Sequence, residues 1–176
     1  QIILQRFIDT NDFNYDISEK LAYVSILLQN YDVVLREYAK QRPLSYDRFV
    51  LDLKTAHVYF LMKDYKAAEQ RYVALLSERK DEEVIYYLSK IYQLTDRMPA
   101  SVALLETVPT FSEYFGEAQV EIADFDKRNN EFNRAINRLT KAHMKRPDLV
   151  LIYKAYSDLW LENKRYVEDI ARLEQG

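Results

Sequence analysis

The sequence contains almost no glycine, with Gly116 and Gly176 as the two examples among 176 residues. Glycine supplies the positive-φ conformations that phosphate-binding loops and tight β-hairpins require. The composition therefore disfavours nucleotide-binding folds and folds built from many β-hairpins. Cysteine is absent altogether, which excludes disulfide bonds and thiolate metal sites.

Histidine is scarce as well, since the chain has two, His57 and His143. Neither has a second histidine or a carboxylate at the helical spacing of a zinc site such as HExxH. No serine lies in the Gly-x-Ser-x-Gly context of a hydrolase nucleophile. Carboxylates are frequent, but pairs such as Asp124 and Asp126 fall in hydrophilic helix positions, which favours a solvated face over general acid catalysis. We therefore predict no catalytic residue, no metal, no cofactor and no enzymatic activity.

Long apolar runs are missing too, because none approaches the roughly 18–20 residues that span a bilayer. We therefore predict no direct membrane insertion. The net charge is −3. The basic stretch of Lys141, His143, Lys145 and Arg146 could contact phosphate, but nucleic-acid binding usually requires a sustained positive surface. The sequence therefore predicts no nucleic-acid partner.

What the sequence does contain is an internal repeat, which is the first feature to test in a helix-rich chain. A short polar break before a large residue recurs five times, at Asn30-Tyr31, Asp64-Tyr65, Met98-Pro99, Glu131-Phe132 and Arg165-Tyr166. The second residues of these pairs are spaced 34, 34, 33 and 34 positions apart. A period kept four times in succession indicates one structural unit repeated along the chain.

Small or branched residues follow the same period. They lie three residues after the break at Val34, Ala68, Val102 and Ala135, and nine residues before it at Ala22, Ala56, Ala123 and Ser157. In the third copy the position nine residues before the break is Lys90, and the small residue Ser89 lies next to it. The register of this copy could therefore be shifted by one residue. Apolar residues between these positions have helical spacing, so each unit is predicted to be a pair of antiparallel helices in close contact. One such hairpin cannot bury its apolar faces alone, but stacked hairpins can.

These features resemble the tetratricopeptide repeat, through the period, the small residue of the first helix and the aromatic-x-x-Ala motif that opens the second. Copy two matches best, at Ala56, Tyr59, Asp64-Tyr65, Ala68, Tyr72 and Leu75. The resemblance covers residues 15–176. It implies an all-α fold, an α-solenoid of about five antiparallel helix-turn-helix repeats in a right-handed superhelix. It also implies a non-enzymatic interaction module or scaffold that binds a protein or peptide partner.

The predicted organisation is a single domain. Its repeats are placed at 15–48, 49–81, 82–115, 116–149 and 150–176, after a partial preceding repeat at 1–14. The helices are predicted at 16–29 and 31–42, 47–62 and 65–78, 82–95 and 98–107, 112–128 and 131–144, and 148–162 and 164–174. Pro99 fits a first helical position, and Pro109 ends that helix early. We expect the array to continue in a longer protein.

In proteins of this resemblance the first helices line a concave groove in which peptides or partner helices dock. Carried over to this sequence, the resemblance implies a partner-binding groove of Tyr23, Leu53, His57, Phe60, Tyr86, Lys90, Asp124, Lys127, Lys154 and Asp158. The groove runs from aromatic and apolar to charged, which suits an amphipathic helix or an extended segment. Chaperone-binding members of the family hold a terminal carboxylate with lysine and asparagine at these positions. Such a clamp is not expected here, because Glu19, Tyr23, Leu53 and Tyr86 occupy many of the corresponding positions. Individual tyrosines could instead pack between neighbouring hairpins.

Two other functions stay open at this point. The array could be a structural spacer or a self-assembly segment of a larger secretion or envelope protein, which would make the chain a homo-oligomer. It could also recruit partners for an enzyme that lies outside this sequence. The imperfect repeats and the absence of cysteine favour a bacterial source, and they fit the cytoplasm and a bacterial periplasm equally well.

Overall fold

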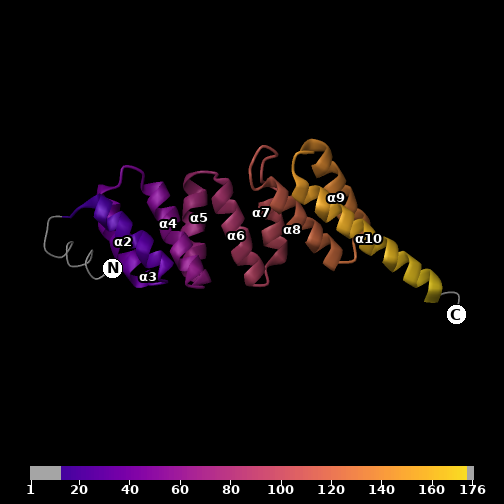
Figure 1. Cartoon of the computed structure of the whole chain (residues 1–176), viewed down its shortest axis with the longest axis horizontal. Coiled ribbons are helices and arrows are strands. Elements are labelled where there is room, and N and C mark those ends of the chain that lie inside the picture. The colour runs from indigo at the N-terminus through magenta and orange to yellow at the C-terminus, as the bar shows by residue number, and fades with distance from the viewer. Residues whose placement is uncertain (1–12, 174–176) are drawn as a thin grey trace. The chain divides into compact units, whose positions relative to one another are not determined.

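The computed structural model describes residues 13–173, and it describes side chains as far as Lys164. The described range is helical and contains no strand. Its elements are α2 (Tyr15–Leu27), α3 (Tyr31–Gln41), η1 (Arg42–Leu44), α4 (Arg48–Leu61), α5 (Tyr65–Glu78), α6 (Glu82–Leu94), α7 (Met98–Leu105), α8 (Phe115–Arg128), α9 (Phe132–Lys145) and α10 (Val150–Leu173) (Figure 1). The partial repeat predicted at 1–14 lies almost wholly outside the described residues.

Side-chain caps begin four of these helices. Asn14, Asp47 and Asp64 each accept a hydrogen bond from the backbone N–H three positions later, at 3.1, 3.2 and 3.1 Å. Asp81 accepts from the N–H groups two and three positions later, at 3.1 and 3.2 Å. Each such cap satisfies N–H groups that have no partner within the helix and stabilises the helix by about 1 kcal/mol. The caps therefore explain why α2, α4, α5 and α6 begin where they do.

One backbone motif closes the turn of every hairpin from α2 to α9. Gln29, Lys63, Asp96 and Asn130 have φ values of 55°, 61°, 57° and 62°. In each turn the N–H of the following residue bonds to the carbonyl five positions back, at 2.7 to 3.0 Å. This is the Schellman end of a helix, in which a left-handed residue satisfies the last carbonyls. Non-glycine residues occupy all four positions, so the turns are made without the glycine that usually occurs there.

The third hairpin shows which register the repeat takes. The small residues buried between paired helices are Ala22, Ala56, Ser89 and Ala123 in the first helices and Val34, Ala68, Ser101 and Ala135 in the second. The third copy thus uses Ser89 and Ser101, so the slip of one residue that the sequence left open occurs here, and Val102 is not the small residue of the second helix. The left-handed residue Asp96 makes Met98 the first residue of α7, which moves the register by one.

The last helix corrects another prediction. Residues 148–162 and 164–174 were expected to form two helices, but α10 is one continuous helix from Val150 to Leu173. Lys164 stands where the other turns have their left-handed residue, and here it continues the helix. The segment Val150–Leu173 has no glycine or proline and is rich in leucine, glutamate, lysine and arginine, so nothing in it ends the helix. None of the described helices has both the length and the hydrophobicity of a membrane span.

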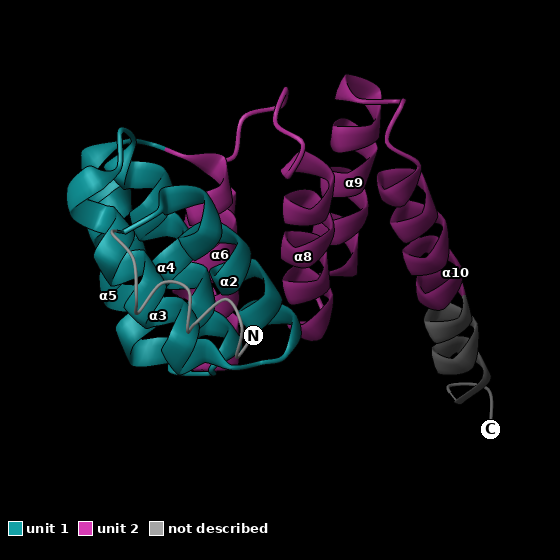
Figure 2. Ribbon diagram, turned by 60° about the vertical axis from the view of Figure 1, so that its left-hand side comes forward, with its two compact units in different colours: residues 1–80 teal, residues 81–176 magenta. Residues whose placement is uncertain are grey.

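The chain divides into two compact units, residues 1–80 and residues 81–176 (Figure 2). In the first unit the α2–α3 and α4–α5 hairpins meet where α3 packs on α4. A core cluster there consists of Ala22, Val34, Tyr38, Leu51 and Val58. The buried Glu37 carboxylate accepts a hydrogen bond from Ser18 Oγ at 2.8 Å and pairs with Lys40 Nζ at 2.9 Å. The one-domain organisation stays a prediction.

The second unit contains the α6–α7 and α8–α9 hairpins and α10, which packs on both α8 and α9. Its buried side chains include Val84, Ile85, Leu88, Ile91, Leu105, Ile122, Leu139 and Ile152. Gly116 lies at the start of α8, where a Cβ atom would come within 3.3 Å of Leu149 Cδ1. Glycine therefore lets the start of α8 approach the segment that leads into α10.

Candidate functional site

The ten residues predicted to line a groove fall in both units. Tyr23, Leu53, His57 and Phe60 belong to the first unit, and Tyr86, Lys90, Asp124, Lys127, Lys154 and Asp158 belong to the second. Each set is therefore described within its own unit. The groove as a whole stays a prediction.

In the first unit the predicted residues divide between surface and packing. Tyr23 is 63% exposed, whereas Leu53 is 8% exposed and belongs to the core. The His57 ring lies 5.7 Å from the ring of the buried Tyr72, and the two side chains come from the two helices of one hairpin. His57 therefore contributes to the packing of α4 against α5. Most of the Tyr23 side chain is therefore accessible to solvent and to a partner.

On α6 the predicted residues are engaged with their neighbours. The Tyr86 ring lies 5.0 Å from the ring of Tyr114, and Lys90 Nζ forms an ion pair with Glu121 on α8. Burial disfavours the charged form of Lys90, but the hydrogen bond and the charge of Glu121 outweigh burial and raise the pKa of Lys90. Gln93 Nε2 also donates to Glu121. These contacts join α6 to α8 and leave Lys90 committed to the structure of the unit.

The Tyr114 side chain is in an environment that disfavours its charge. Burial, followed by the nearby carboxylates Glu83 and Glu113, raises the pKa of Tyr114 to about 12. Burial also raises the pKa of Glu83, with Asp81 and Glu113 adding like-charge repulsion. Glu83, at the start of α6, and Glu113 and Tyr114, just before α8, therefore lie close enough together that their negative charges would repel one another.

The other four predicted residues of the second unit lie together. Asp124, Lys127, Lys154 and Asp158 surround a cleft of about 300 Å³, which we name the α8–α10 cleft. The remaining lining residues are Val120, Ala123, Leu139, Leu151, Ala155, Leu159 and Glu162. This arrangement arises because α8 and α10 occupy the first-helix positions of successive repeats and each presents the same helical face.

Charge of both signs surrounds an apolar base in this cleft. Lys127 Nζ lies 3.5 Å from Asp124 on its own helix and 3.3 Å from Glu162 on α10. Ala123, Leu139 and Leu159 are buried, whereas Leu151 is 42% exposed. Lys127 is thus paired with two carboxylates, whereas Lys154 and Asp158 lie on α10 at the same cleft and form no ion pair with another residue of the described part of the chain. The cleft can bind an apolar side chain between charged neighbours.

A second cleft in the same unit was not predicted from the sequence. Its volume is about 820 Å³ and we name it the α9 cleft. The lining residues are Glu106, Thr107, Val108, Pro109, Thr110, Phe115, Gln119, Arg134, Asn137, Arg138, Lys141, Ala142 and Lys145. They come from the α7–α8 connection, from the start of α8 and from one face of α9. No residue among them also lines the α8–α10 cleft.

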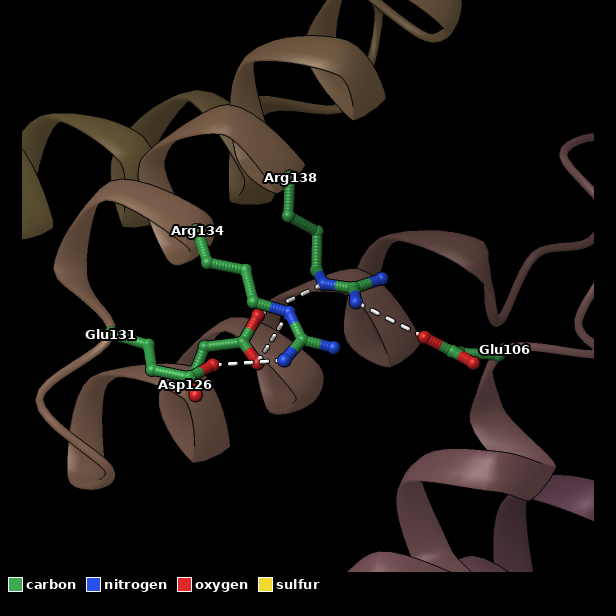
Figure 3. A network of polar contacts seen from close by, with 5 residues as sticks. All are labelled: Glu106, Asp126, Glu131, Arg134 and Arg138. Atoms are coloured by element: carbon green, nitrogen blue, oxygen red, sulfur yellow. Dashed lines mark hydrogen bonds and ion pairs between the residues drawn. The ribbon is translucent and has the colours of Figure 1, made fainter.

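Three residues of this lining, Glu106, Arg134 and Arg138, belong to a network of ion pairs (Figure 3). Asp126, on α8, lies between the two arginines of α9, with its carboxylate 3.4 Å from Arg134 Nε and 3.2 Å from Arg138 Nε. Arg138 also pairs with Glu106 at 3.1 Å, and Arg134 pairs with Glu131 at 2.9 Å. Asp126 was expected on a solvated face, but it is 1% exposed. That expectation is wrong because two guanidinium groups replace water around the carboxylate.

The fold, the repeated hairpin and the clefts between its helices define a class, the α-helical repeat proteins. No protein-family model and no curated protein matches the sequence. Solved structures do match, and tetratricopeptide-repeat proteins are among them. The chain therefore has the tetratricopeptide-repeat fold, as the period of its sequence predicted.

Three of these structures show the extent of the likeness. A tetratricopeptide repeat protein from Parabacteroides merdae is 15% identical, with a TM-score of 0.66 over 98% of this chain and 69% of its own. MamA from Desulfovibrio magneticus is 11% identical, with a TM-score of 0.65 over 92% of this chain and 93% of its own. YrrB, described as a protein with an unusual peptide-binding site, is 13% identical, with a TM-score of 0.59 over 92% of this chain and 84% of its own.

Proposed function

We propose that this chain is a non-enzymatic protein-interaction module, and that its α8–α10 cleft binds a peptide segment of a partner protein. The observation that carries the proposal is the meeting of Asp124, Lys127, Lys154 and Asp158 around one apolar cleft. Apolar anchors surrounded by polar groups are the usual construction of protein interfaces.

The size and chemistry of the cleft indicate the kind of ligand. A volume of about 300 Å³ is at the small end for ligand pockets, and it suits one or two side chains of a peptide. Leu151 and the buried base would contact an apolar side chain. Lys154 and Asp158, on α10, would pair with flanking charges of opposite sign and so fix the direction of the peptide.

The comparisons support a peptide as the ligand. YrrB shares the fold and has a peptide-binding site. Binding a protein segment is thus the function that fits the surfaces of this molecule.

Leu151→Ala and Leu161→Ala make a matched pair of variants for the test. Both leucines lie on α10 with similar exposure, 42% and 50%, but Leu151 lines the cleft and Leu161 does not. Peptides selected on the wild-type chain from a random displayed library would serve as probes. Truncating Leu151 removes apolar contact worth about 1–2 kcal/mol, so affinity should fall about 5- to 30-fold.

Fluorescence anisotropy with labelled selected peptides measures the effect, and circular dichroism checks that both variants are folded. Loss of affinity in Leu151→Ala, with Leu161→Ala close to wild type, supports the proposal. Equal affinity in both variants rules out the α8–α10 cleft. Failure to select any peptide, together with concentration-dependent light scattering by the chain alone, would favour the alternative of a self-assembly segment.

A further inference from the structure

The basic side chains of the α9 cleft differ in whether they are neutralised. Arg134 and Arg138 are held by Asp126, Glu131 and Glu106, as described above. Because three carboxylates surround these two arginines, this part of the lining has little positive charge left for a ligand (Figure 3).

A further basic residue, next to the cleft in sequence but not among its lining residues, is also paired. Arg146 lies just after α9, where its Nη2 is 2.7 Å from Asp148 and its Nη1 donates to the carbonyl oxygen of Thr110 at 2.9 Å. The second contact ties the α7–α8 connection to the end of α9. Arg146 therefore holds the backbone of a cleft-lining residue, Thr110, and its own charge is paired with Asp148.

Lys141 and Lys145 remain, and they are the unbalanced cations of the cleft. Both side chains line it and both are exposed. Neither forms an ion pair with any carboxylate in the part of the chain that the structure describes. They are four residues apart on α9, so they project from the same face, with Cα atoms about 6 Å apart along the helix axis.

We propose that the α9 cleft is a second interaction surface, and that it binds an extended acidic segment of a partner protein. In an extended chain, alternate side chains point the same way and repeat about every 6.7 Å. Two acidic residues with one residue between them therefore match the spacing of Lys141 and Lys145. Their carboxylates accept hydrogen bonds from the two ammonium groups.

The rest of the lining fits a peptide better than a nucleic acid. Val108, Pro109 and Phe115 give the lining an apolar part, although Val108 and Phe115 are each 5% exposed, so an aliphatic side chain of the peptide would contact only a small apolar area there. Asn137 and Gln119 offer amide groups that both donate and accept hydrogen bonds, as a peptide backbone requires. Two lysines on a chain of net charge −3 are too few to follow a phosphate backbone.

The test compares two double variants of equal net charge. Lys141→Glu with Lys145→Glu reverses the charge of the cleft, and Lys20→Glu with Lys66→Glu reverses two exposed lysines of the first unit. The probe is a fluorescein-labelled peptide, Glu-Ser-Glu-Leu-Glu-Ser-Glu. Two labelled comparison ligands are used: the same peptide with every glutamate replaced by lysine, and an oligothymidylate as the nucleic acid. Fluorescence anisotropy at about 0.1 M salt, where charges are screened over about 10 Å, measures binding to each chain.

The wild type should bind the acidic peptide more tightly than the basic one, and the affinity should fall as salt rises. Reversal at Lys141 and Lys145 should weaken binding at least about tenfold, because attraction becomes repulsion at both contacts. The control pair should stay within about twofold of wild type, since neither Lys20 nor Lys66 lines the α9 cleft and salt at about 0.1 M screens charges that do not contact the peptide. Lys141→Gln with Lys145→Gln should give an intermediate loss, and it serves as the test if charge reversal unfolds α9.

Three results would overturn the proposal. One is an acidic peptide that binds both double variants as well as it binds wild type. Another is equal weakening in the control pair, which would show a response to net charge alone. The third is tighter binding of oligothymidylate than of the acidic peptide, which would assign the surface to nucleic acid. Leu151→Ala should leave this binding unchanged, so the two clefts can be tested separately.

Discussion

Asp126→Asn removes the buried charge that joins α8 to α9, and it keeps nearly the same side-chain volume. The carboxylate is 1% exposed and interacts with Arg134 and Arg138 of α9. Asparagine can accept one hydrogen bond through its amide oxygen, but it loses the ionic attraction. Its NH₂ group would also point a donor at a guanidinium donor.

The structure sets the magnitude of this change. Breaking a fully buried ion pair costs about 3–5 kcal/mol, because the remaining charge has no partner. Here the Arg134 side chain is 59% exposed and can be hydrated, and Arg138 keeps Glu106 as its second partner. Charged hydrogen bonds in less buried positions contribute about 1.5–3 kcal/mol each. We therefore expect the second unit to lose about 2–3 kcal/mol of unfolding free energy.

Urea denaturation followed by tryptophan fluorescence measures this loss within the second unit. Trp160, on α10, is the single tryptophan of the chain. Asp124→Asn is the matched control, since Asp124 is an exposed aspartate of the same helix, and it should change stability by no more than about 0.5 kcal/mol. Adding Arg138→Gln to Asp126→Asn should cost about 1–2 kcal/mol less than the sum of the single changes. Equal stability of the Asp126→Asn and Asp124→Asn variants would refute the reasoning.

Two further predictions concern the hairpin turns and alkaline stability. Lys63→Gly should leave the free energy of unfolding unchanged or raise it by up to about 1 kcal/mol. Lys63 has a φ of 61°, a left-handed conformation that glycine adopts without the steric cost of a Cβ atom. Gln70→Gly, an exposed interior position of α5, should lower stability by about 1 kcal/mol, and similar losses for both glycine variants would contradict the turn geometry. Tyr114 has its pKa raised to about 12, so its neutral form favours the folded state, and this contribution is lost as the pH rises from about 10 through 12. Tyr114→Phe should therefore reduce the alkaline loss of thermal stability, and identical pH profiles for the two proteins would count against this explanation.

The repeat period was enough to predict the four hairpins from α2 to α9, because it depends on residues that must be small or aromatic wherever two helices cross. Ala56 and Ala68 are both fully buried, as their positions in the period indicate. The third copy could not be placed in register, since Met98 and Pro99 both suit the start of a helix. The left-handed residue of this turn is Asp96, whereas the other turns have Gln29, Lys63 and Asn130 at the same place. No single residue type therefore marks the position in the sequence. The end of the hairpin turn is therefore poorly marked in the sequence.

The site was predictable only where one helical face determines it. Asp124 and Lys127 share a face of α8, and Lys154 and Asp158 share a face of α10, so the positions that the tetratricopeptide resemblance implied for a groove lie together at the α8–α10 cleft. Asp126 looked like a surface residue because its partners are 8 and 12 positions further along, on another helix. The α9 cleft depends on the path of the α7–α8 connection, for which the sequence has no periodic signal. Continuity of α10 was missed because the turns of this chain use no glycine.

Amide chemical shifts of the ¹⁵N-labelled chain, recorded with and without a selected peptide, test the central claim most directly. The account predicts that the largest shifts occur in residues 120–127 of α8 and 151–162 of α10, and that α3 and α5 are unaffected. It further predicts that Leu151→Ala abolishes these shifts at the same peptide concentration, whereas Leu161→Ala preserves them. Shifts that occur outside α8 and α10 and leave these two helices unchanged would contradict the account.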